Sequence, residues 1–95
     1  MTYDEAEIIA LKTLSYILSN QELRNTFIDK TGLDEITLRE RLKDSEHLAG
    51  IMDYLSADEA LLGDFCAHSD ISPMDAMKAW EKLAKPDSDL QRNLC

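Results

Sequence analysis

One short stretch of the sequence places a carboxylate, a thiol and an imidazole close together, at Asp64, Cys66 and His68. A cysteine beside a histidine base is the pairing found at many nucleophilic active sites. Residues two positions apart on a helix point about 200° away from each other, so Cys66 and His68 cannot share a hydrogen bond there. Cys66 also follows Phe65 on the apolar side of the expected helix, where free cysteine commonly serves as a small core residue. We therefore predict a buried thiol rather than a nucleophile.

Metal and phosphate chemistry also lack a sequence motif. The chain contains no C-x-x-C, H-x-x-x-H or E-x-x-H spacing, and its other histidine, His47, lies at the expected start of a helix. A glycine-rich phosphate loop, an acidic calcium loop and a nucleophile elbow are missing as well. We predict that the protein is not an enzyme and that it has no catalytic residue, metal site or cofactor.

The charge balance narrows the choice of partner. Nineteen acidic residues stand against ten basic ones, which gives a net charge of -9. Nucleic-acid affinity depends on basic side chains that neutralise phosphates, and the cytoplasmic leaflet of a membrane is also anionic. Even the segment that most resembles a DNA-reading helix, residues 34–44, holds three basic against four acidic residues. We expect neither nucleic acid nor membrane as a partner, but another protein.

Two further features bear on the compartment. No run approaches the eighteen or so apolar residues that a membrane span requires, and Asp4 and Glu5 stand where a secretory signal would be basic. Cys66 and Cys95 are too few and too isolated for the disulfide framework of a small secreted domain. We expect a cytoplasmic protein with two free thiols.

The elements that position these residues are predicted to be helices. Apolar residues recur at three- and four-residue steps, and glycine and proline are scarce, which predicts an all-α bundle of five or six short helices. The first helix is expected over about residues 3–19, and Gly32 should end the second in a left-handed conformation. The predicted N-terminal caps are Thr2 in a capping box with Glu5, Asn20, Asp34, Asp44 or Ser45, Ser56 in a second capping box with Glu59, and Ser72 before Pro73.

The C-terminal part of the chain carries a methionine-rich row. Met74, Met77, Trp80 and Leu83 recur at three-residue steps in the last expected helix, and we predict that this row is core. If part of the row were exposed, flexible methionines beside an aromatic ring would instead suit a groove that receives a partner's helix. Pro86 should end that helix, because proline disfavours helix in the residue before it. We expect a single helical domain over residues 1–85 and a flexible polar tail over residues 86–95.

A shift of 38 residues aligns the two halves of the chain without a gap. The pairs that it superposes are Tyr16 and Tyr54, Asn20 and Asp58, Leu23 and Leu61, Phe27 and Phe65, Leu33 and Ile71, and Asp34 and Ser72. The physical interpretation is two related helical hairpins packed face to face, with an N-terminal helix. Each hairpin would then cover the apolar side of the other.

Several of these segments resemble a known family. They are Leu14 with Tyr16-Ile17-Leu18, Phe27 with Thr31-Gly32-Leu33, Asp53-Tyr54-Leu55, Asp58-Glu59-Ala60-Leu61-Leu62, and Phe65. Together they resemble the domain-of-unknown-function family numbered 3572, which consists of small and mostly alphaproteobacterial proteins. The resemblance implies a short helical bacterial protein and brings no functional residues with it. Asp70 stands where the family usually has the glycine of the second hairpin turn, which should leave that turn less free to adopt a positive φ.

Two functions remain open from the sequence. Between Asp44 and Met77 the chain has eight acidic residues and no Lys or Arg, and we predict an acidic docking surface for a basic partner protein at Asp53, Asp58 and Asp64. The protein would then be a non-enzymatic interaction or regulatory module. The alternative is a carrier of a small apolar ligand, with a pocket between the hairpins lined by Met52, Tyr54, Phe65 and Trp80.

Overall fold

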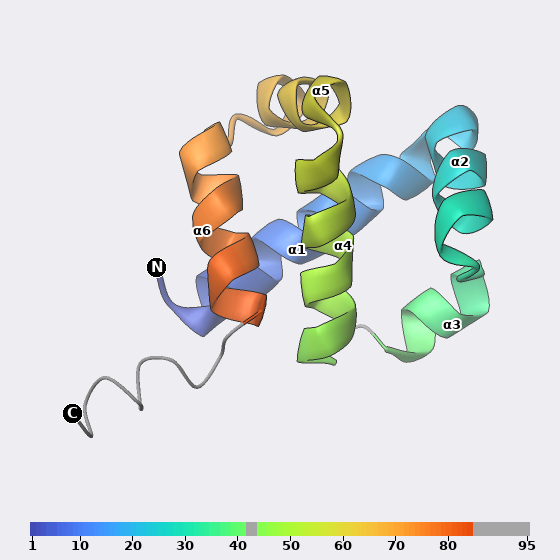
Figure 1. Ribbon diagram of the computed structural model, residues 1–95, viewed down its shortest axis with the longest axis horizontal. Coiled ribbons are helices and arrows are strands. Elements are labelled where there is room, and N and C mark those ends of the chain that lie inside the picture. The colour runs from blue at the N-terminus through green and yellow to red at the C-terminus, as the bar shows by residue number, and fades with distance from the viewer. Residues whose placement is uncertain (42–43, 85–95) are drawn as a thin grey trace.

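The computed structural model describes residues 1–41 and 44–84, and this part of the chain forms six α-helices (Figure 1). They are α1 (Tyr3–Ser19), α2 (Gln21–Thr31), α3 (Glu35–Glu40), α4 (Ser45–Ala57), α5 (Glu59–Ser69) and α6 (Pro73–Ala84). The described residues contain no strand, so the predicted all-α bundle is confirmed. The tail predicted at 86–95 lies outside the described residues.

Side-chain caps define most helix starts, as the sequence predicts. The side chains of Asn20, Asp34 and Asp58 each accept a hydrogen bond from the backbone N–H three residues further on, at 3.2, 2.8 and 3.1 Å respectively. Thr2 and Glu5 form the predicted capping box at the start of α1. Each cap satisfies a backbone donor that the helix itself leaves unpaired, so these residues fix where the chain changes direction.

One predicted cap is wrong. Ser56 does not start a helix, because α4 continues through Ala57 and Asp58 is both the last cap of α4 and the first cap of α5. A carboxylate is the stronger acceptor at the positive end of a helix dipole, so Asp58 takes the role predicted for Ser56. The Ser56 hydroxyl is left buried, without a hydrogen-bond partner among the described residues.

The core forms where α1, α4 and α6 meet. These three helices pack against one another more extensively than any other described elements, and α2 with α3 lies at the far side of α4 from α6 (Figure 1). The buried apolar residues are Ala6, Ala10, Leu14, Ile17, Phe27, Leu38, Leu48, Ile51, Met52, Leu55, Leu61, Phe65, Cys66, Ala76, Ala79 and Leu83. None of the described helices is both long and apolar enough to cross a membrane.

The prediction for the last helix is wrong in part. Met74 is 67% exposed and Met77 is 42% exposed, and α6 instead buries Ala76, Ala79 and Leu83. A three-residue step advances only about 300° around a helix, so a row at this spacing winds off the face that is buried. The two methionines therefore lie on the surface, while Leu83 at the end of the row reaches the core.

The two halves of the chain are related as the 38-residue shift predicts. Helices α2 and α5 have equal lengths and coincide after the shift, as do the starts of α3 and α6. We call α1 to α3 the first repeat and α4 to α6 the second repeat. Gly32 and Asp70 end the two matching helices, both in the left-handed conformation, with φ of 73° and 56°. Asp70 thus adopts a positive φ, although the sequence analysis expected this turn to be less free to do so. Asp tolerates this region better than most residues.

The repeats exchange aromatic contacts. Tyr16 of the first repeat packs on Phe65 of the second, with ring centroids 5.7 Å apart. Tyr54 of the second repeat packs edge-on against Phe27 of the first, at 4.9 Å. Tyr16 matches Tyr54 and Phe27 matches Phe65 under the 38-residue shift, so each repeat gives its tyrosine to the phenylalanine of the other. The repeats therefore face each other with approximate two-fold symmetry.

Candidate functional site

The three predicted acidic residues all lie on the surface of the second repeat. Asp53 lies on α4, Asp58 lies between α4 and α5, and Asp64 lies on α5. All three are exposed, as are the five other carboxylates between residues 44 and 77. Asp58 also caps α5, so part of its charge serves the helix rather than a partner. The structure therefore leaves the side chains of Asp53, Asp58 and Asp64 exposed to solvent.

The four residues predicted to line an apolar pocket make contacts with different partners. Met52 and Phe65 are 0% exposed and fill the core, and the Met52 sulfur lies 3.4 Å from the Thr13 hydroxyl. Tyr54 packs on Phe27, and burial together with the nearby Asp58 raises its pKa. Trp80 is half-buried. The structure does not gather these side chains around one hollow.

Trp80 lines a hollow between α4 and α6. Its volume is about 220 Å³, and its walls are Asp53, Ser56, Ala57, Met77 and Trp80. We call these five residues the docking groove. Met74 stands one helical turn before Met77 and extends the apolar strip along α6. The groove thus combines a carboxylate, a buried hydroxyl without a hydrogen-bond partner in the described part of the chain, and an apolar wall that continues onto the exposed surface.

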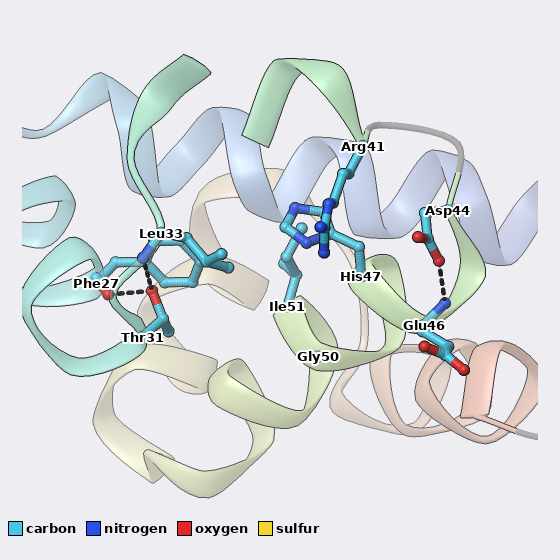
Figure 2. A pocket seen from close by; sticks show the side chains of 9 residues that line it. All are labelled: Phe27, Thr31, Leu33, Arg41, Asp44, Glu46, His47, Gly50 and Ile51. Atoms are coloured by element: carbon cyan, nitrogen blue, oxygen red, sulfur yellow. Dashed lines mark hydrogen bonds between the residues drawn. The ribbon is translucent and has the colours of Figure 1, made fainter. Parts of the chain in front are cut away.

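A second hollow, of about 300 Å³, lies at the other end of the molecule, where α2, α3 and α4 meet (Figure 2). We call it the His47 pocket. Phe27, Leu33, Gly50 and Ile51 give it an apolar wall, whereas Thr31, Arg41, Asp44, Glu46 and His47 give it polar groups. It therefore joins apolar surface to three charged side chains and an imidazole.

Local hydrogen bonds position this wall. The Thr31 hydroxyl donates to the Phe27 carbonyl at 2.7 Å and accepts from the Leu33 N–H at 3.3 Å, which fixes the turn after Gly32 (Figure 2). On the other side, the Asp44 carboxylate accepts from the Glu46 N–H at 3.0 Å and starts α4. The cap brings Asp44, Glu46 and His47 into one turn at the pocket.

His47 is the unusual member of this set. It is only 8% exposed, and its Nε2 atom is buried without a hydrogen-bond partner in the described part of the chain. Burial lowers its pKa and the positive charge of Arg41 adds to this, while Asp44 acts in the opposite direction. The imidazole is therefore neutral at pH 7. A buried polar atom with no partner costs about 1–3 kcal/mol, so the structure carries an unfavourable group at this position.

The sequence prediction missed the His47 pocket. It assigned His47 only to a helix start, because a lone histidine has no motif. The repeat contains the missing signal: the 38-residue shift places His47 on Ile9, which packs against the core. The second repeat thus has a polar residue at a position where the first repeat has an apolar residue packed on the core.

The predicted burial of Cys66 is confirmed. Cys66 is 8% exposed and free, and burial raises the pKa of its thiol. His68 is exposed on the surface and packs on the Tyr16 ring, with centroids 5.1 Å apart. In residues 1–41 and 44–84, no group of three or more His, Cys, Asp or Glu side chains could hold a metal ion.

The family comparison covers all six helices. The family described as "Protein of unknown function (DUF3572)" matches the chain over residues 3–86. The chain belongs to this family. The resemblance predicted from the sequence is thereby confirmed. No curated protein and no solved structure matches the chain.

On the surface of this DUF3572 protein, the docking groove and the His47 pocket differ in chemistry. The docking groove is shallow, apolar and acidic at its edge, which suits a helix of another protein. The His47 pocket is bounded by charges of both signs and contains a buried imidazole, which suits a small molecule. The two sites lie on different sides of α4, so each can be altered without the other.

Proposed function

We propose that this DUF3572 protein is a non-enzymatic binding module that receives a basic amphipathic helix of a partner protein in the docking groove. The observation that carries the proposal is the apolar strip of Met74, Met77 and Trp80 beside the exposed carboxylate of Asp53. The strip would take the apolar face of the partner helix, and the carboxylates would take its basic flanks.

Met74 and Met77 supply the flexible part of the apolar strip. An unbranched, flexible side chain adapts to different partner surfaces, and methionine is over-used where proteins bind helices. Met74 and Met77 are two of the five large hydrophobic residues that are exposed in the described chain, and they are neighbours on one helix. Beside them Trp80 supplies a half-buried ring at the groove, and tryptophan is enriched among residues that dominate binding energy.

The exposed carboxylates should determine the charge of the partner helix. The eight carboxylates between residues 44 and 77 are all exposed, and no Lys or Arg interrupts them. Such a surface raises the association rate of a basic partner and disfavours an acidic one. Asp53 is the carboxylate that lines the groove itself, so it should contribute most. Asp58 and Asp64 lie further out and should contribute less.

The test uses a defined peptide. A fluorescein-labelled peptide of roughly five helical turns, built from Leu on one face and Lys on the other, is titrated with the full-length protein. We expect saturable binding by anisotropy and a blue shift of Trp80 emission. A matched peptide with Glu in place of Lys should bind at least about tenfold more weakly, a difference of about 1.4 kcal/mol.

Paired variants localise the binding. Met77→Ser and Asp53→Lys should each weaken binding of the basic peptide by about tenfold. Ile36→Ser removes an exposed hydrophobic residue from α3, and Asp29→Lys makes the same charge change on α2, so both should bind as the wild type does. Equal losses in Asp53→Lys and Asp29→Lys would reduce the effect to net charge and contradict the docking groove.

A further inference from the structure

The methionines of the described chain are either exposed or fully buried. On α6, Met74 is 67% exposed and Met77 is 42% exposed, and Met77 lines the docking groove. Met52 is 0% exposed, and its sulfur lies in the core, 3.4 Å from the Thr13 hydroxyl. A peroxide has to approach the sulfur lone pair directly, so it oxidises exposed methionines before buried ones. Two sulfurs that are open to an oxidant therefore lie on the surface that would receive a partner helix.

We propose that Met74 and Met77 form a reversible oxidation site, and that their oxidation by a peroxide releases the partner helix from the docking groove. This inference rests on the proposed function and adds its regulation. The sulfur lone pair attacks one oxygen of H₂O₂, the O–O bond breaks, and the departing hydroxide takes the proton of the transferred oxygen. Each thioether is thus oxidised to a sulfoxide while the peroxide is reduced to water. A methionine sulfoxide reductase reverses the step with two thiols, which form a disulfide and water.

Oxidation changes the one property of these side chains that binding uses. The thioether of Met77 is apolar and flexible, and it lies in the same groove wall as the Trp80 ring. A sulfoxide is polar, and its oxygen accepts hydrogen bonds from water while the groove is empty. An apolar face of a partner helix would strip this water away and offer no donor in return, which is unfavourable. The oxidised strip should therefore bind the helix more weakly than the reduced strip.

The fold can tolerate this modification. Helix α6 packs on α1 and α4 and buries Ala76, Ala79 and Leu83, so its core contacts do not depend on the two exposed methionines. Met52 is the methionine whose sulfoxide would disrupt the core, and its burial protects it. Oxidation at the groove should therefore change binding while the helical bundle stays folded, unlike general oxidative damage.

The experiment oxidises the full-length protein and measures both the modification and the binding. Cys95→Ser serves as the background, because hydrogen peroxide would also oxidise that thiol. Cys66 is kept, since burial raises the pKa of its thiol and leaves little reactive thiolate. We expect mass spectrometry to find oxygen on Met74 and Met77 well before Met52. The fluorescein-labelled basic peptide should then bind at least about tenfold more weakly, with an unchanged circular dichroism spectrum.

Two controls assign the loss of binding to the groove sulfurs. Treatment of the oxidised protein with methionine sulfoxide reductases for both sulfoxide epimers, and dithiothreitol, should restore peptide binding. The double variant Met74→Leu, Met77→Leu retains apolar side chains without sulfur, and its affinity for the peptide should be equal before and after peroxide. Met1 is 41% exposed and lies outside the groove, so it is still oxidised in this variant and reports that the peroxide has acted.

Three results would overturn the oxidation site and leave the proposed function intact. One is equal peptide affinity of the protein before and after Met74 and Met77 are oxidised. Another is oxidation of Met52 as early as that of Met77. The third is a loss of affinity after peroxide in the double leucine variant, which would assign the effect to other residues. Absence of peptide binding before any peroxide is added would instead contradict the docking groove itself, and the oxidation site with it.

Discussion

The third helices of the two repeats differ more than any other matching elements. Helices α3 and α6 start at equivalent positions, but α3 has 6 residues and α6 has 12. The longer helix packs along both α1 and α4 and closes the core on its side. In the described chain α3 makes no comparable contact and buries Leu38. The same repeat therefore produces a closed core where its last helix is long and an open pocket where it is short.

The largest effect should come from breaking the contacts of α6. Leu83→Ala removes a side chain that is 1% exposed between α1 and α4, and we expect a loss of about 3 kcal/mol in the free energy of unfolding, measured with urea. Leu38→Ala removes the buried side chain of α3, which is 0% exposed. It should increase amide hydrogen exchange in α3 selectively, because α3 can open without the core. Equal protection of α3 and α6 in the wild type would contradict this difference between the repeats.

The next effect concerns His47 and Ile9. His47→Ile should raise the free energy of unfolding by about 1–2 kcal/mol, because it removes a buried atom that has no hydrogen-bond partner among the described residues and retains the packing volume. The reciprocal Ile9→His should lower the free energy of unfolding by a similar amount. Chemical denaturation of both variants checks the pair. A destabilised His47→Ile would mean that the imidazole already has a stabilising partner.

The turns of the two repeats offer a smaller comparison. Gly32→Ala should cost about 1 kcal/mol, since φ is 73° there and a Cβ is strained in the left-handed region even though it would meet no neighbour within 4 Å. Asp70→Gly, at φ of 56°, should stabilise the protein by a few tenths of a kcal/mol. Thermal unfolding can rank the two variants. A stabilised Gly32→Ala would show that the turn changes conformation.

The smallest effect is a pH dependence confined to the second repeat. Burial and Arg41 lower the pKa of His47 below its ordinary 6.5, so the unfolded chain binds the proton more readily than the folded one. The free energy of unfolding should therefore fall as the pH drops below about 6.5. Above that pH the contribution of neutral His47 should be fully present. The Asp44 carboxylate acts on this pKa in the opposite direction, so the measurement is the difference between the wild type and His47→Ile. Parallel pH profiles would exclude His47 as the source.

A second pH effect should lie at more acidic values. Hydrogen bonds from the Thr2 and Thr37 backbone lower the pKa values of the capping carboxylates Glu5 and Asp34. Stability from these caps is present above the ordinary carboxylate range and is lost as the pH falls through it. Both caps belong to the first repeat, and His47→Ile should leave their contribution unchanged. The contribution of these caps should therefore cancel when the pH profiles of the wild type and His47→Ile are compared.

Local rules predicted much of the fold. Asn20 and Asp34 cap because their oxygens reach the N–H groups three residues on, and Gly32 stops α2 because it accepts a positive φ. The pairing of Phe27 with Phe65 across the 38-residue shift also anticipated two buried rings. These features depend on neighbours in the sequence or on the internal repeat, and both are visible without coordinates.

The failures all depend on packing between distant segments. Ser56 and Asp58 are both good caps, and only the length of α4 decides between them. Met74 and Met77 fit a core row by spacing, but α6 rotates so that Ala76 and Ala79 face α1 and α4. The burial of His47 follows from the meeting of α2, α3 and α4, which no local pattern encodes. The exposed positions of Asp53 and Asp64, in contrast, needed only the charge pattern.

The reciprocal rings have a consequence for the history of the chain. A half-length polypeptide with one tyrosine and one phenylalanine at these positions would find partners for both in a second, identical copy. Joining two such copies end to end would place both sides of their interface in one chain and release the two halves from having to stay the same. One half could then keep a long final helix, while the other shortened it and accepted a histidine where an isoleucine had been.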